Sequence, residues 1–335
     1  MHSGKSYHIG EFIIWTRRNI FLLLLIGAVP VVLFDVFKIY WIAIPWTVVA
    51  LLGTATAFIV GFKNTQAYNR TWEARQIWGA IVNSSRSWGA MSKNMVTDDA
   101  KSKELIYRHF AWLTALRYQM RDSRIWETAS KSYNKEYRKY YRIPEKETTL
   151  ESELIKYLDP KEIESILKNK NRATQLLAKQ SKLLRELMDS GQLDTFQYIE
   201  MQKILNEFFE HQGKSERIKN FPYPRQFATI NTFFIRLFCF LLPFGMLFEF
   251  SKMNDYVDGF MKGHMVWLVL PFSVLISWVF TSLEQVGESA ENPFEGSAND
   301  VPISQISRTI EIDLREMLGE TVLPEPLTPM NNIVL

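Results

Sequence analysis

Four long apolar runs lie at the two ends of this chain, and they constrain its fold more than any other feature. They are residues 19–34 and 39–62 near the start, and 227–248 and 265–283 near the end. A helix that crosses a membrane needs about 20 mostly apolar residues. The second and fourth runs have that length. The third has it if Arg236, its one charged residue, is tolerated, and the first has it if the helix starts near Phe12. We therefore expect four membrane spans.

Basic residues set the expected orientation of these spans. They gather before the first span and after the second, whereas the two short connections carry little net charge. Because positive side chains favour the cytoplasmic side, we expect both termini and the long middle segment in the cytoplasm. The expected location is the plasma membrane, which would be the inner membrane in a bacterium, with multiple passes. The basic residues behind this prediction are Lys5, Arg17, Arg18, Lys63, Arg70, Arg75 and Arg86.

The segments outside the spans have the pattern of helices. Between residues 63 and 226 glycine and proline are few, and leucine and isoleucine recur at helical spacing. Helix starts are indicated by Asp159 before Pro160 and by Asp194 with Gln197. Ser304 is expected to cap a last helix that precedes an extended, proline-containing tail. No strand pattern persists.

The predicted fold is therefore an all-α membrane protein with four transmembrane helices and a helical cytoplasmic region. Residues 1–18 are expected to form a cytoplasmic or interfacial segment, and 19–62 to hold the first two spans. Residues 63–226 are expected to form the cytoplasmic helical region, 227–283 to hold the last two spans, and 284–335 to form a cytoplasmic loop, helix and tail.

Several classes of function lack support in the sequence. The formal net charge of +3 gives no reason to expect nucleic-acid binding. Cys239 is the only cysteine, so no intrachain disulfide can form. The five histidines lack metal-ligand spacing, and no nucleophile elbow or dinucleotide fingerprint occurs. We expect no enzyme, no cofactor and no metal site.

One acidic cluster offers an alternative to the absence of a metal site. Glu284, Glu288, Glu291 and Glu295 carry the oxygen ligands that a divalent cation prefers. The favoured interpretation is a solvated acidic helix end and loop.

The second span carries the most informative helix face. Thr54, Phe58 and Phe62 are spaced four apart, so they lie along one face of a helix. Gly53, Ala57 and Gly61 form an adjacent stripe of small residues, which permits close helix approach. In a ring of such helices the two phenylalanines would form a hydrophobic constriction, which can gate ions by dewetting. Ordinary packing within a monomeric bundle is the alternative.

The polar continuation of this span resembles the bestrophin family. The string from Gly61 to Gly79 carries the likeness, and it recurs around Asn292-Pro293-Phe294 and in the segment from Asn299 to Glu311. The compact length resembles that of bacterial members. The residues of the family motif, expected to be structural, are Tyr68, Arg70, Glu73, Arg75, Trp78, Gly79, Asn292, Pro293 and Phe294.

This resemblance implies a homopentameric ion channel with a central pore. It places Phe62, Phe58 and Thr54 in the hydrophobic neck, where threonine departs from the bulky apolar residue expected. It also implies a second constriction at the cytoplasmic exit, for which Ile218 and Phe221 are the candidates.

The resemblance also bears on gating by calcium. Calcium-gated members of the family carry an acidic run after Asn-Pro-Phe. Here Gly296, Ser297 and Ala298 interrupt that run, so we do not expect calcium to be required for opening.

The resulting prediction is a channel for small monovalent ions, with chloride and other anions favoured and the hydrophobic neck as its gate. Its expected partners are further copies of itself, the lipid bilayer and the permeant ions. A monovalent-cation channel of the same architecture, selective for sodium, is the first alternative. A secondary transporter and a membrane-anchored scaffold are the others, although none of the four runs contains an Asp or Glu that a transporter would use at mid-membrane depth.

Overall fold

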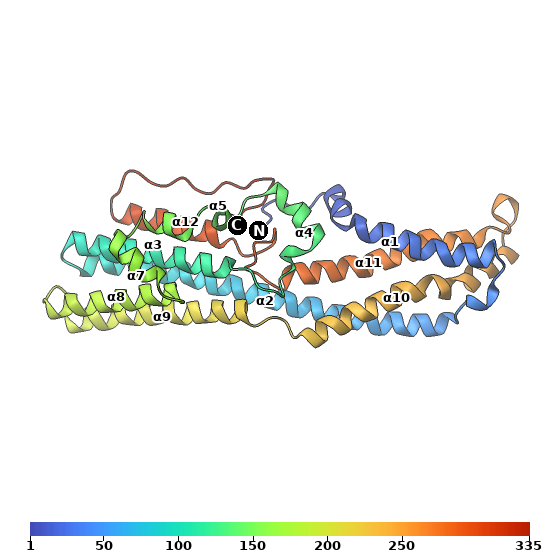
Figure 1. Cartoon of the computed structure of the whole chain (residues 1–335), viewed down its shortest axis with the longest axis horizontal. Helices are drawn as coiled ribbons and strands as arrows, with labels where there is room; N and C mark the ends of the chain where they lie inside the picture. Colours follow the sequence, from blue (N-terminus) through green and yellow to red (C-terminus); the bar gives the residue numbers. More distant parts are fainter. The chain divides into compact units, whose positions relative to one another are not determined.

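The computed structural model describes residues 1–335, and its regular elements are all helices (Figure 1). Four segments are long and apolar enough to cross a membrane: Ile9–Asp35, Tyr40–Met95, Arg225–Asp255 and Met265–Ala290. The predicted all-α class and the four spans are confirmed. The first helix begins at Ile9, which gives it the length that its uncharged run lacks, and leaves Arg17 and Arg18 exposed.

The chain divides into two compact units. The membrane unit comprises Lys5–Asn69 and Tyr223–Glu291, and the polar unit comprises Met1–Gly4, Arg70–Pro222 and Asn292–Leu335. These limits differ from the boundaries expected at 62, 226 and 283 by seven, four and eight residues.

Helix α2 (Trp46–Met95) does not end with its apolar run. It is 50 residues long, or about 75 Å at 1.5 Å per residue. The charged residues after Phe62 end the membrane-compatible composition, but no proline follows them to end the helix.

The membrane unit is built from α1 (Ile9–Asp35), the first part of α2, α10 (Arg225–Lys252) and α11 (Val269–Ala290). Helices α1, α10 and α11 contact one another around a core of aliphatic and aromatic side chains. Polar side chains also join α1 to α11. Trp278 Nε1 donates to Thr16 Oγ1 at 2.9 Å, and Asn19 Nδ2 donates to Gln285 Oε1 at 3.2 Å. Such bonds between helices add to van der Waals packing where apolar burial gives little driving force.

Two glycines bring α2 and α10 together. A Cβ on Gly53 would lie 2.7 Å from Phe238 Cε2, and one on Gly245 would lie 2.7 Å from Val49 Cγ2. Both positions therefore require glycine for close approach. Cys239 is buried in the same region of α10, where its thiol lies 3.8 Å from the Ser277 carbonyl oxygen.

The polar unit contains the rest of α2 together with α3 (Asp99–Arg121), α8 (Arg172–Asp189), α9 (Thr195–Asn220) and α12 (Ile303–Met317). Its core includes the fully buried rings of Trp88, Trp112 and Phe208. His109 lies among these rings and its Nε2 is 2.9 Å from Ser85 Oγ. Burial lowers the pKa of His109 to about 3, so this side chain is neutral at physiological pH. The shorter helices are α4 (Ser132–Tyr137), α5 (Pro144–Glu147), α6 (Leu150–Leu154) and α7 (Pro160–Leu167).

Short 3₁₀ turns complete the secondary structure. They are Tyr40–Ile42, Thr128–Ser130, Arg138–Tyr140, Met253–Asp255, Gly259–Met261 and Met265–Leu268.

The helix starts expected from the sequence have different outcomes. Asp194 and Gln197 form a reciprocal capping box, as predicted. Pro160 opens α7 as predicted, but the Asp159 side chain makes no cap hydrogen bond. The expected cap at Ser304 is wrong, since Pro302 occupies the N-cap position of α12; the Ser304 hydroxyl donates instead to Glu145 Oε1 at 2.6 Å.

The two chain ends lie together in the polar unit (Figure 1). Val334 N donates to Met1 O at 3.0 Å, and Ser3 N donates to Asn332 O at 2.7 Å. The residues after α12 run as an extended strap, as expected from their prolines, and the last residue is buried.

Candidate pore-lining segment

One face of α2 in the membrane unit is left uncovered by its own chain. Phe58 is 67% exposed and Phe62 is 71% exposed, and Thr54 is exposed one turn before them. The opposite face is buried, with Thr56 and Val60 packed inside the unit. Two large aromatic side chains therefore stand on a helix face that the protomer itself does not bury.

The neighbours of these aromatics leave this face open. Thr54 Oγ1 donates to the Ala50 carbonyl at 3.0 Å, so its hydroxyl proton is used within the helix. A Cβ on Gly61 would meet no heavy atom within 4 Å, in contrast to the close contact at Gly53. Gly53 thus serves packing inside the protomer, while the surface around Gly61 is open.

Charged residues follow this face along α2. Lys63 is only 3% exposed, and its positive charge and that of Arg236 both act on the carboxylate of Glu284 on α11. Glu73 pairs with Arg217 in the polar unit. These groups carry both signs of charge, so they do not indicate an ion selectivity.

Arg70 has a structural role that the sequence does not reveal. Its Nη2 donates to the carbonyl oxygens of Ile218 at 2.8 Å and Phe221 at 2.9 Å. These carbonyls lie at the end of α9, where backbone acceptors lack helical partners and a positive charge is favourable. The guanidinium group therefore fixes the segment that carries both candidates for the cytoplasmic aperture.

The structure separates those two candidates. Ile218 is 4% exposed and belongs to the core of the polar unit, whereas Phe221 is 67% exposed. A side chain buried in its own protomer does not line an opening, so the placement argues against Ile218 and leaves Phe221 as the candidate.

Four other motif residues are buried in the polar unit. Trp78 is fully buried and its ring centroid lies 6.3 Å from that of Phe294, while Asn292 and Pro293 are buried before it. Arg121, which sequence reasoning missed, donates from Nη1 to the Phe294 carbonyl at 3.0 Å. Tyr68, Arg75 and Gly79 are instead exposed on α2.

The carboxylates of Glu295 and Asp300, which follow Phe294, accept hydrogen bonds from neighbouring groups of the chain. Glu295 accepts hydrogen bonds from Thr128 N at 2.8 Å, Thr128 Oγ1 at 2.7 Å and Ser297 Oγ at 2.6 Å. Asp300 Oδ2 accepts from Gly296 N at 2.7 Å and Ser297 N at 3.0 Å. Burial, and next the charge of Glu295, raise the pKa of Asp300 to about 7.

The acidic cluster considered from the sequence is not assembled into a metal centre. Glu291 pairs with Arg225 at 3.1 Å, and nowhere in the chain do three or more potential metal ligands converge.

Comparisons with known proteins identify relatives over most of the chain. The family model described as Bacterial/Fungal Bestrophin protein matches residues 14–316. The voltage-dependent anion channel-forming protein YneE of Escherichia coli K12 is 28% identical over 280 residues, which cover 84% of this chain and 79% of YneE. A Ralstonia nicotianae protein of the same description, RSc3414, is 24% identical over 82% of this chain and 78% of its own.

A solved structure has the same fold. The crystal structure of a bacterial bestrophin homologue from Klebsiella pneumoniae aligns with a TM-score of 0.76 at 23% identity, covering 91% of this chain and 99% of the other.

Proposed function

Because this chain belongs to the bestrophin family, as its motif strings predicted, we propose that it forms an anion channel as a homopentamer. The relatives are named as anion channel-forming proteins, and neither they nor the family model points to an enzyme. The proposed permeant ion is chloride or another small monovalent anion. The proposed location is a bacterial inner membrane, with both termini in the cytoplasm.

The observation that carries the pore assignment is the uncovered face of α2. Phe58 and Phe62 are 67% and 71% exposed on a helix whose opposite face is packed. In a pentamer this face would turn toward the symmetry axis, and each position would contribute five rings to one short passage. Such a passage repels water, so it is proposed to act as the gate by dewetting.

The proposed neck has no charge of its own with which to select ions. Phe58 and Phe62 are apolar and the Thr54 hydroxyl donates to its own helix. Selection for anions is therefore assigned to the electric field of charged groups outside the neck and to the free-energy cost of removing water from the permeating ion. Phe221 is the proposed lining residue of the cytoplasmic aperture, held in place by Arg70.

Alanine substitution in purified channels tests this proposal. Phe62→Ala and Phe58→Ala should raise conductance or open probability in a planar bilayer, because a wider neck fills with water more readily. The reversal potential in a chloride gradient should stay on the anion side and be unchanged. Phe21→Ala, which removes a similarly exposed ring from α1, is the matched control and should leave currents unaltered.

Three outcomes would overturn the proposal. Unchanged currents in both neck variants would mean that this face packs against protein or lipid, and a reversal potential on the cation side would refute anion conduction. Native mass measurement in detergent tests the stoichiometry, and a stable monomer or dimer would refute the pentamer.

A further inference from the structure

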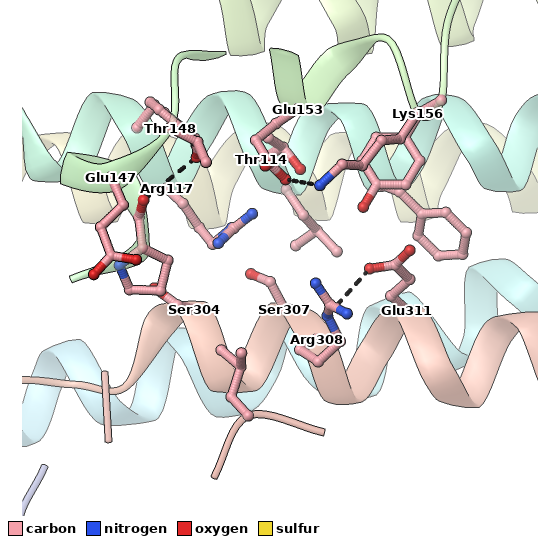
Figure 2. Close-up of a pocket in the computed structure, with 16 residues that line it drawn as sticks. Thr114, Arg117, Glu147, Thr148, Glu153, Lys156, Ser304, Ser307, Arg308 and Glu311 are labelled. Atoms are coloured by element: carbon pink, nitrogen blue, oxygen red, sulfur yellow. Dashed lines mark hydrogen bonds and ion pairs between the residues drawn. The ribbon is translucent and has the colours of Figure 1, made fainter. Parts of the chain in front are cut away.

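A polar cavity lies in the polar unit, and none of the proposed neck residues lines it. Its volume is about 130 Å³, enough for several water molecules, since each takes roughly 30 Å³ in the liquid. Its walls come from α3, from the segment containing α5 and α6, from α12 and from the strap (Figure 2). Hydroxyl, guanidinium and carboxylate groups form most of the lining, with Phe110, Leu113 and Leu327 as apolar walls.

Arg117 enters the cavity from α3. Its Nη1 donates to Glu145 Oε1 at 2.7 Å, but Glu145 also lies 3.5 Å from the Nε of Arg121, so two guanidinium groups share one carboxylate. The Nε of Arg117 is buried and has no hydrogen-bond partner. This N–H group can therefore donate a hydrogen bond to an ordered water or a ligand in the cavity.

Arg308 enters the same cavity from α12, opposite Arg117 (Figure 2). Its Nε lies 3.5 Å from Glu311 Oε2, which is long for a charge-assisted bond. Glu311 makes shorter bonds to Arg315, at 3.0 and 3.1 Å. Arg308 also donates to the Glu325 carbonyl of the strap at 3.4 Å. Its charge is therefore only partly neutralised.

Hydroxyl groups stand between the two arginines. Ser307 Oγ donates to the Ile303 carbonyl at 2.8 Å and keeps its lone pairs, and Thr114 is a further hydroxyl in the lining. Lys156 adds a third positive group and is paired with Glu153 at 2.7 Å. The cavity thus offers two fork-shaped donors on facing helices, which is the arrangement suited to an oxyanion.

We propose that this cavity binds a phosphate group, either as inorganic phosphate or as a small phosphomonoester. Phosphate oxygens would accept from Arg117 Nε and from the Arg308 guanidinium group. Glu147, Glu153 and Glu311 also line the cavity, and such carboxylates disfavour an anion that cannot donate a hydrogen bond to any of them. Hydrogen phosphate carries one P–OH group that donates to such an acceptor, whereas sulfate at neutral pH carries none. The ligand joins α3 to α12 and holds the strap beside them.

Equilibrium dialysis of the full-length channel tests this inference without any measurement of current. Labelled inorganic phosphate, and in a second arm labelled glycerol 3-phosphate, are titrated at constant ionic strength in chloride buffer. Saturable binding of one phosphate group per protomer is expected, and the tighter-binding arm identifies the source of the group. Sulfate should compete at least about tenfold less well.

Three variants locate the site. Arg308→Gln should weaken binding by about tenfold or more, because a charge-assisted pair of hydrogen bonds is lost. Ser307→Ala removes a hydroxyl whose proton is already donated to the Ile303 carbonyl, so it should weaken binding less than Arg308→Gln. Arg185→Gln is the matched control, since Arg185 is exposed on α8, pairs with Asp189 at 3.0 Å and does not line the cavity. Its affinity should equal that of the unmodified channel.

Three results would overturn the inference. They are no saturable phosphate binding, equal affinity in Arg308→Gln and Arg185→Gln, and sulfate competition as strong as that of phosphate. Each leaves the channel proposal intact, because currents do not enter the measurement.

Discussion

Replacing Arg70 with glutamine should loosen the end of α9 and lower the thermal stability of the polar unit. The change removes the two hydrogen bonds that Arg70 donates to the carbonyls of Ile218 and Phe221, at 2.8 and 2.9 Å. A hydrogen bond to a charged group contributes roughly 1.5–3 kcal/mol, and a cation at a helix C-terminus about 0.3–1 kcal/mol. Because the bond to Phe221 is solvent-exposed, we expect a loss of about 2 kcal/mol per protomer.

This loss can be measured as a shift in melting temperature. For a unit of this size each kcal/mol lowers the melting temperature by roughly 2–4 °C, so Arg70→Gln should melt about 4–8 °C below the unmodified channel. Tryptophan fluorescence of the detergent-purified channel reports the transition. Arg70→Lys should fall between the two, because one ammonium group does not reproduce a planar fork that reaches two carbonyls.

Arg75→Gln is the matched control for this prediction. Arg75 is exposed on the same helix, five residues further along. Replacing it with glutamine removes the same charge as Arg70→Gln does. If Arg70→Gln and Arg75→Gln melted within about 1 °C of each other, the two carbonyl bonds would contribute nothing to stability and the assignment of Arg70 as an anchor would be refuted.

Three further predictions concern buried positions. Trp78→Ala should destabilise the polar unit by roughly 3–5 kcal/mol, because it opens a cavity beside Phe294, and Trp78→Phe should cost less in the same melting assay. Burial raises the pKa of Asp300 to about 7 from its ordinary 3.8, so the folded state binds more protons between these values and stability falls as pH rises through them. Asp300→Asn should flatten the pH dependence of the melting temperature in that range, and an unchanged profile would contradict this. Gly53→Val should cost roughly 1–3 kcal/mol, because its Cβ would lie 2.7 Å from the Phe238 ring, whereas Gly213→Ala, with nothing within 4 Å, should be tolerated.

The sequence was sufficient for features that depend on local composition. Apolar run length predicted four spans, and the local pairing of Asp194 with Gln197 predicted a helix start that the structure confirms. The end of α2 could not be predicted from the sequence. The loss of apolar residues after Phe62 marks the end of a membrane-compatible segment and not the end of a helix.

Features that depend on distant parts of the chain could not be predicted. The carbonyls that Arg70 contacts lie about 150 residues further along. The two arginines of the cavity also come from helices far apart in sequence. Ile218 and Phe221 are similarly apolar, so composition could not tell that one is buried and the other exposed. The pore assignment of Thr54, Phe58 and Phe62 stays a prediction, since their exposure in one protomer is compatible with it but does not test it.

The burial of Cys239 makes the protein suited to labelling experiments with introduced cysteines. Because this is the only cysteine and it is packed inside the membrane unit, water-soluble maleimides or methanethiosulfonates should find no reactive native group. Single cysteines introduced along α2 at positions 54 to 69 could then be labelled one at a time without first removing a background signal. The periodicity of their labelling rates would trace the wetted stripe of the helix residue by residue, in the open and closed states alike.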